Sequence, residues 1–89
     1  MTGYSLVITN SAHRKIKRLD RPVRERITKA LRRLADTWPQ STGVVRLVNI
    51  TPPEYRLRVG DWRVRFRVDT TAKVLVVLRV SPRAKAYER

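Results

Sequence analysis

One short stretch, residues 55–68, constrains the fold more than any other part of the chain. It reads Tyr-Arg-Leu-Arg-Val-Gly-Asp-Trp-Arg-Val-Arg-Phe-Arg-Val, with apolar and basic residues alternating on both sides of a Gly-Asp pair. This pattern is typical of a β-hairpin whose strands are joined by a two-residue turn. With Gly60 and Asp61 in the turn, the expected cross-strand pairs are Val59 with Trp62, Arg58 with Arg63, Leu57 with Val64 and Arg56 with Arg65. One face is then apolar and the other is a grid of guanidinium groups, which favours a polyanionic ligand or abundant counter-ions.

The charge of the whole chain supports this interpretation. The 89 residues carry 21 Lys plus Arg, of which 16 are arginine, against 7 Asp plus Glu, for a formal net charge of +14. A charge of this size on a small domain points first to nucleic acid and second to an anionic membrane surface. Arginine favours the first, because its planar fork binds phosphate through two hydrogen bonds and stacks on bases.

Several classes of function are disfavoured by what the chain lacks. It has no cysteine and a single histidine, His13, so neither a disulfide framework nor a clustered metal centre is expected. No apolar run approaches the length of a bilayer span and no signal pattern opens the chain, so we expect a cytoplasmic protein without a membrane partner. The length predicts one domain over residues 1–89, with an open and shallow site.

Periodicity predicts the remaining elements. Residues 4–9 favour a strand, and Asn10 or Ser11 is expected to cap a short basic helix. A break at residues 20–22 leads to a second helix, with Pro22 in its first turn and its end near Thr37. Strands are predicted at 44–49, along the hairpin, and at 73–80, where low alternation suggests a strand internal to the sheet.

These elements predict an α+β fold. A first strand and a two-helix hairpin precede four strands that form a mainly antiparallel twisted sheet, and the helices cover its apolar face. The arginine side of the central strands is then left partly open.

The order of elements, the 55–64 hairpin and the ending with Arg83 and Tyr87 resemble the RelE/ParE superfamily of toxins from type II toxin–antitoxin modules. The resemblance covers essentially the whole chain and is closest to the RelE-like branch. Members of that branch are ribosome-dependent mRNA endonucleases, which cut in the ribosomal A site by attack of a ribose 2′-OH on the adjacent phosphate, without a metal or other cofactor. The resemblance implies an acidic antitoxin partner, the ribosome with A-site mRNA, and a toxin–antitoxin heterotetramer in the neutralised state.

The resemblance also implies site residues. Five positions match the family's catalytic pattern: Arg56, Arg58, Arg63, Arg83 and Tyr87. Four more basic residues are expected to bind RNA: Arg46, Arg65, Arg67 and Lys85. The chain departs from the pattern in carrying arginine where many relatives have lysine before the turn, and Pro82 where many have histidine.

Guanidinium groups suit this reaction, because in-line attack builds negative charge on the non-bridging phosphate oxygens and preorganised donors stabilise that charge. Arg63 and Arg83 are the candidates for this role, and Arg56 and Arg58 are expected to grip the backbone. An arginine is a poor general base. Tyr87, Glu54 or a ribosomal group are the open alternatives for it.

Two other functions remain possible at this stage. A ParE-like inhibitor of DNA gyrase would act by protein contact without nuclease activity. A basic RNA-binding module would have no chemistry. An apolar groove between the helical hairpin and the sheet edge is the expected seat for an amphipathic antitoxin helix.

Overall fold

A computed structural model of the chain describes residues 3–86, with side chains placed as far as residue 84. The elements follow the order β, α, α, β, β, β, β, α along the chain. Their bounds are β1 Ser5–Ile8, α1 Asn10–Lys17, α2 Arg21–Thr37, β2 Val44–Arg46, β3 Tyr55–Val59, β4 Trp62–Asp69, β5 Val74–Pro82 and α3 Arg83–Ala86.

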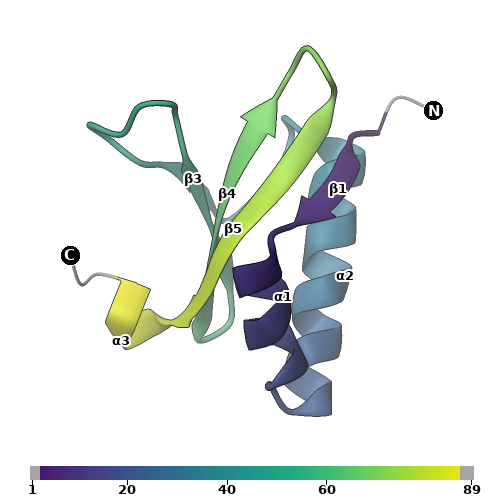
Figure 1. The fold of residues 1–89 in the computed structure, drawn as a ribbon, viewed down its shortest axis with the longest axis vertical. Coiled ribbons are helices and arrows are strands. Elements are labelled where there is room, and N and C mark those ends of the chain that lie inside the picture. The colour runs from purple at the N-terminus through teal and green to yellow at the C-terminus, as the bar shows by residue number, and fades with distance from the viewer. Residues whose placement is uncertain (1–2, 87–89) are drawn as a thin grey trace.

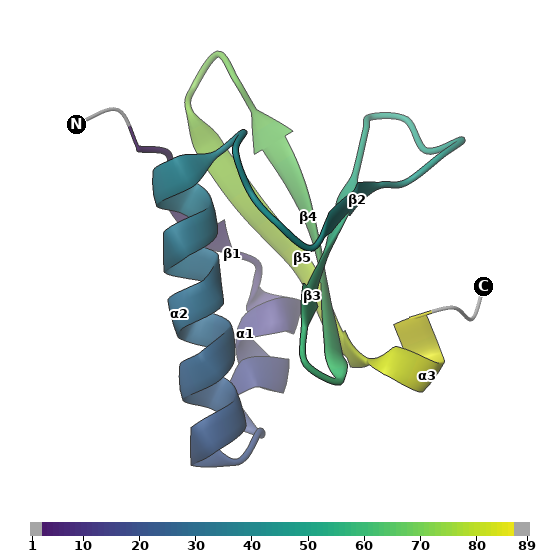
Figure 2. The ribbon, with the colours of Figure 1, turned by 180° about the vertical axis from the view of Figure 1, so that it is seen from behind.

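The strands form one five-stranded mixed sheet in the order β1-β5-β4-β3-β2. Strand β1 runs parallel to β5, and every other neighbouring pair is antiparallel. The predicted α+β class is therefore confirmed, and β5 is internal to the sheet as its apolar sequence indicated. Helices α1 and α2 lie together on one side of the sheet, whereas α3 and the loop between β2 and β3 project on the other side (Figures 1 and 2).

The helix layer and the sheet enclose a single apolar core. Ile27 and Leu31 from α2 meet Val64 and Phe66 from β4, and all four side chains are at most 1% exposed. Trp38, just after α2, closes the end of this core with its ring edge-on to Phe66 at 5.5 Å between centroids. The core therefore occupies one face of the central hairpin and leaves the other face without a covering layer.

The two helices start and stop where local chemistry dictates. Thr9 caps α1, because its Oγ1 accepts the backbone N–H of Ala12 at 3.3 Å, so the prediction of a cap at Asn10 or Ser11 was one to two residues late. Pro22 lies in the first turn of α2, where a missing N–H costs nothing, and α2 ends at Thr37 as predicted.

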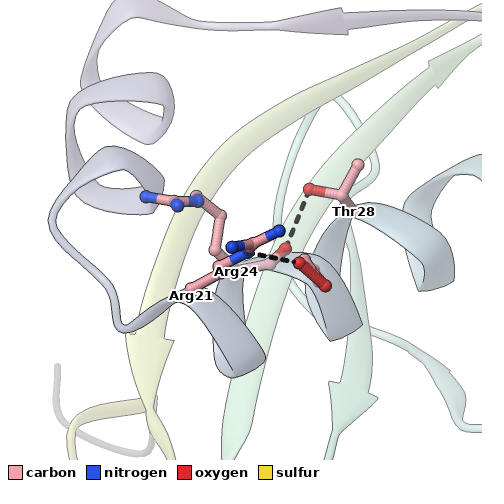
Figure 3. Close-up of polar contacts among 4 residues, drawn as sticks. Arg21, Arg24 and Thr28 are labelled. Carbon is pink, nitrogen blue, oxygen red and sulfur yellow. Dashed lines mark hydrogen bonds and ion pairs between the residues drawn. The ribbon is translucent and has the colours of Figure 1, made fainter.

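The exposed side of α2 carries many cations, some of which are engaged within the helix. Arg21 Nε donates to Glu25 Oε1 at 2.9 Å, one turn further along, and Thr28 Oγ1 donates to the carbonyl oxygen of Arg24 at 2.8 Å (Figure 3). Such an exposed ion pair adds little stability. It does show that a carboxylate on the helix layer offsets part of its positive charge.

Two strand ends and one helix differ from the predictions. Strand β2 ends at Arg46 rather than Asn49, because Asn49 takes a positive φ of 60° that no strand accommodates. Strand β5 continues to Pro82, beyond the expected end at residue 80, and it is followed by α3, which the sequence did not indicate. Within the described residues, no helix is long and apolar enough to cross a membrane.

A β-bulge interrupts the ladder between β4 and β5. Arg65 pairs with Arg79 and the next residue, Phe66, pairs with Val77, so Leu78 has no partner on β4. An extra residue of this kind bends and twists the strand that carries it. The bulge explains the weak alternation of β5, because it lets both Val77 and Val80 reach the core.

Candidate functional site

The central hairpin forms with the predicted register. All four expected pairs are present, from Val59 with Trp62 to Arg56 with Arg65. Gly60 has a φ of +57°, and Asp61 is not among the residues with positive φ, which is the pattern of a type II′ turn with glycine in its first position. The residues of the turn are therefore well suited to their positions.

Arg63 differs from the expected open grid of guanidinium groups. Its side chain folds back on the turn, and Nη1 donates to the carbonyl oxygens of Gly60 at 2.8 Å and Trp62 at 3.0 Å. Arg63 is only 6% exposed, the one charged residue buried within the described part of the chain. Burial of a guanidinium is tolerated when carbonyl groups accept its protons. Arg63 therefore holds the turn together from the arginine side.

Four of the five predicted catalytic residues meet at one open hollow of about 750 Å³, which we call the arginine hollow. Its lining residues come from β2 and the residue before it, from β3, β4, the turn and α3, and they are Gly43, Val44, Val45, Arg56, Arg58, Gly60, Asp61, Arg63 and Arg83. Arg58 and Arg83 are exposed, and Arg56 is half-buried. The hollow presents cationic groups to solvent on a firm sheet.

Arg83 comes from the far end of the chain. As the first residue of α3, it donates its backbone N–H to the carbonyl oxygen of Asp61 at 2.8 Å. Arg26 of α2 also lies near the same turn, since its Nη1 is 3.1 Å from where a Cβ on Gly60 would stand. Tyr87 lies outside the described residues, and the side chain of Lys85 is not placed.

Across the central strands, arginines stand opposite one another in two rows. One row joins Arg58 and Arg63 to Ser81, and the next joins Arg56, Arg65 and Arg79. Arg79 is not among the residues predicted from the sequence, because it lies inside an apolar run. A lone charged residue within such a strand was the signal that could have revealed it.

A carboxylate bonds to Arg65 in the second of these rows. Arg65 Nη2 donates to Glu54 Oε1 at 2.7 Å, with the two side chains 31% and 19% exposed. Arg65 Nε is buried and has no acceptor within the described residues. Glu54 does not line the arginine hollow, so the structure places this candidate base beside Arg65 instead.

Two predicted RNA-binding residues lie elsewhere. Arg46 is exposed and pairs with Tyr55, which puts it on the face of the sheet that carries the core rather than with the arginine rows. Arg67 lines a separate hollow of about 520 Å³ with Trp38, Pro52 and Tyr55 among its neighbours. The alternation of side chains along a strand does not distinguish Arg46 and Arg67 from Arg65.

A further hollow of about 530 Å³ forms a groove between the second half of α2 and β3. Its lining includes Ala30 and Leu34 from α2, Leu57 and Arg58 from β3, and the polar segment 40–42. Arg58 lines both this groove and the arginine hollow. A molecule seated against α2 would therefore also reach the cationic site.

The residues present suit binding of an anion. In the described part of the chain, no three His, Cys, Asp or Glu side chains gather to form a possible metal site. The arginine hollow instead offers guanidinium donors whose geometry matches phosphate. It is open, as needed for a polymeric ligand, and it lacks the enclosing walls of a small-molecule pocket.

Comparisons with known proteins assign this fold to a class. The RelE–RelB complex from Pyrococcus horikoshii is similar over 96% of this chain and 99% of the matched chain, with 26% identity and a TM-score of 0.79. The Mycobacterium tuberculosis RelBE2 toxin–antitoxin complex gives 24% identity and 0.79 over 94% and 95%. A mutant Escherichia coli RelE in the free state gives 23% and 0.72 over 97% and 88%. The fold is thus that of the RelE-like toxins.

The family follows from the sequence match. Residues 6–87 match the model of the ParE toxin of type II toxin–antitoxin systems, parDE. Because the match spans nearly the whole chain, the protein belongs to this family within the RelE/ParE superfamily of toxins. A search of curated proteins found no significant match.

Proposed function

We propose that this toxin cleaves mRNA in the ribosomal A site and so inhibits translation. The observation that carries the proposal is the convergence of Arg56, Arg58, Arg63 and Arg83 at one open hollow. A toxin that acts only by protein contact has no evident use for a phosphate-sized set of guanidinium groups. The likeness to RelE chains points the same way.

The proposed reaction is an in-line transfer at phosphorus. The ribose 2′-oxygen loses its proton and bonds to the adjacent phosphorus, while the bond to the 5′-oxygen of the next nucleotide breaks and that oxygen gains a proton. Negative charge builds on the non-bridging oxygens in the transition state. Exposed Arg58 and Arg83 stabilise it, and each preorganised donor of this kind is worth about 3–4 kcal/mol.

Arg63 takes a different role from the one predicted for it. Its Nη1 already serves two carbonyl oxygens of the turn, so we assign it to holding the turn against which Arg83 is positioned. Since Glu54 is bonded to Arg65 away from the hollow, Tyr87 or a ribosomal group is the better candidate for proton transfer. Tyr87 would also suit stacking on a base.

The proposed partners follow from the same surfaces. The P. horikoshii and M. tuberculosis relatives were each solved with an antitoxin, and we extend this to a cognate acidic antitoxin for the present chain. The groove between α2 and β3 suits an amphipathic helix, and its occupant would meet Arg58 at the edge of the site. A heterotetramer of two toxins and two antitoxins, and binding of the free toxin to the ribosome, complete the proposal.

A second candidate function is inhibition of DNA gyrase without nuclease activity. The observation in its favour is that the matching family model is that of ParE. A third, a basic RNA-binding module without chemistry, fits the charge but not the convergence of Arg83 with the hairpin.

Expression of the free toxin in a translating extract separates these functions. New mRNA ends at A-site codons, mapped by primer extension, are expected from an mRNA endonuclease. Gyrase-trapped DNA breaks with intact mRNA would instead support the ParE-like function. Binding to RNA with translation unimpaired and no new ends would support the module without chemistry.

A further inference from the structure

The row formed by Arg56, Arg65 and Arg79, which we call the arginine row, crosses three strands next to the arginine hollow. We propose that it is a second phosphate subsite, which holds the phosphate adjacent to the one in the hollow. This inference rests on the proposed RNA substrate and extends it by one nucleotide. Arg65 and Arg79 carry no catalytic role in the proposed reaction.

The register fixes the spacing of the two subsites. Arg58 and Arg56 are two residues apart on β3, as are Arg63 and Arg65 on β4, so the rows lie about 6.8 Å apart along the strands. That separation is close to the distance between neighbouring phosphates in an extended single strand. Side chains two residues apart also point to the same face of the sheet.

Continuity with the hollow sets the direction of the strand. Arg56 lines the arginine hollow and is also the first member of the arginine row. A phosphodiester backbone that leaves the hollow past Arg56 therefore meets Arg65 and then exposed Arg79 on the next strands. The β-bulge immediately before Arg79 keeps this side chain on the arginine face while Val77 returns to the core.

The electrostatics of the row call for an anion. Like charges directly opposite each other destabilise a sheet, and here three occur in succession. Glu54 offsets part of this charge through its bond to Arg65. Arg79 is exposed at the end of the row, so a phosphate that binds there would offset more of the repulsion.

A non-cleavable trinucleotide tests this subsite. The probe is 2′-O-methyl RNA with two internal phosphates, together with two versions in which one or the other phosphate is an uncharged methylphosphonate. Affinities are measured at low salt for the wild type, Arg79→Gln and Arg83→Gln. The matched control is Arg32→Gln, an exposed cation on α2, on the opposite side of the sheet.

The wild type should lose about tenfold in affinity with each methylphosphonate, as expected for a charge-assisted contact. Arg79→Gln should bind the native probe about tenfold more weakly. The affinity of Arg79→Gln should no longer depend on one of the two methylphosphonate replacements, and the affinity of Arg83→Gln should no longer depend on the other. The slope of log affinity against log salt should fall in magnitude by about 0.7 for Arg79→Gln. Arg32→Gln should behave as the wild type.

The outcomes separate this inference from the proposed function. Suppose that Arg83→Gln no longer responds to one methylphosphonate, but Arg79→Gln responds to both as the wild type does. The second subsite is then wrong, and binding of a phosphate in the arginine hollow is retained. If the wild type is insensitive to both replacements, the second subsite is wrong, and cleavage of mRNA on programmed ribosomes separately decides the proposed function. A hexaglutamate peptide serves as the probe for an acidic protein partner. Loss of its binding in Arg79→Gln, with RNA sensitivity unchanged, would assign the row to such a partner and overturn the inference.

A second variant should raise, rather than lower, the contribution of the second phosphate to affinity. Glu54→Gln removes the carboxylate that competes for Arg65, so the contribution of the second phosphate should rise several-fold. This increase should vanish in the Glu54→Gln, Arg79→Gln double variant. An unchanged contribution in Glu54→Gln would contradict the assignment of Arg65 to the subsite.

Discussion

The backbone N–H of Arg83 donates to the carbonyl oxygen of Asp61 at 2.8 Å, which joins the start of α3 to the turn of the central hairpin. The turn is therefore the place where several parts of the site meet. Arg63 bonds it from within the sheet, and Arg26 of α2 lies against Gly60 from the other layer. The cations of the hollow thus depend on the geometry of two turn residues.

Substitution of Gly60 should destabilise the protein. Gly60→Ala places a Cβ on a residue with φ +57° and 3.1 Å from Arg26 Nη1. We expect a loss of about 1–2 kcal/mol in the free energy of unfolding, measured by chemical denaturation. Gly3→Ala, at a glycine without positive φ, is the control and should change much less. Equal effects of the two variants would contradict this description of the turn.

Arg63 and Arg58 should differ in what their loss costs. Arg63→Ala leaves the carbonyl oxygens of Gly60 and Trp62 without their donor, so the free energy of unfolding should fall by about 1–3 kcal/mol. Arg58→Ala removes an exposed side chain and should stay within about 0.5 kcal/mol of the wild type.

The same two variants can also be compared by their mRNA cleavage activity. Both variants should reduce mRNA cleavage, Arg58→Ala through lost charge at the phosphate and Arg63→Ala through a misplaced turn. A stable Arg63→Ala protein would show that the guanidinium is not needed to hold the turn.

Thr9 is expected to stabilise two elements at once. Its Oγ1 accepts the N–H of Ala12 and donates to the carbonyl oxygen of Leu78, each at 3.3 Å. Thr9→Ala should therefore lower the free energy of unfolding by about 1 kcal/mol, measured by thermal or chemical denaturation. Thr9→Ser retains the hydroxyl and should recover most of the loss; no recovery would argue against the cap.

The core prediction compares a buried and an exposed apolar side chain. Leu31 is 1% exposed and Val48 is 79% exposed. Leu31→Ala should cost about 2–5 kcal/mol through lost contacts and a cavity. Val48→Ala should remain within about 0.5 kcal/mol of the wild type by the same denaturation assay. A small effect of Leu31→Ala would mean that α2 is loosely held on the sheet.

Much of the fold could be predicted because local signals determine it. The Gly-Asp pair within an alternating sequence fixed the register of the hairpin residue by residue, and Pro22 and Pro39 bracketed the second helix. The resemblance to toxins implied a grouping of Arg83 with the hairpin, and in the structure Arg83 lines the arginine hollow together with the hairpin arginines.

The remaining features arise from tertiary structure. The bulge opposite Arg65 shifts the pairing of β5, so no alternation rule could place Arg79 beside Arg65. The inward turn of Arg63 depends on carbonyl oxygens that become acceptors only when the hairpin closes. Arg46 shares the basic character of its neighbours, yet its face follows from pairing with Tyr55 on another strand.

The most direct test of the proposed function follows cleavage of one defined mRNA on programmed ribosomes. Wild-type toxin, Arg83→Ala and Arg32→Ala are compared by primer extension, with folding of each protein checked by circular dichroism. We predict A-site ends with the wild type and Arg32→Ala, and their loss by a factor of about 100 or more with folded Arg83→Ala. Intact mRNA with the wild type, or equal cleavage by Arg83→Ala, would contradict a catalytic arginine hollow.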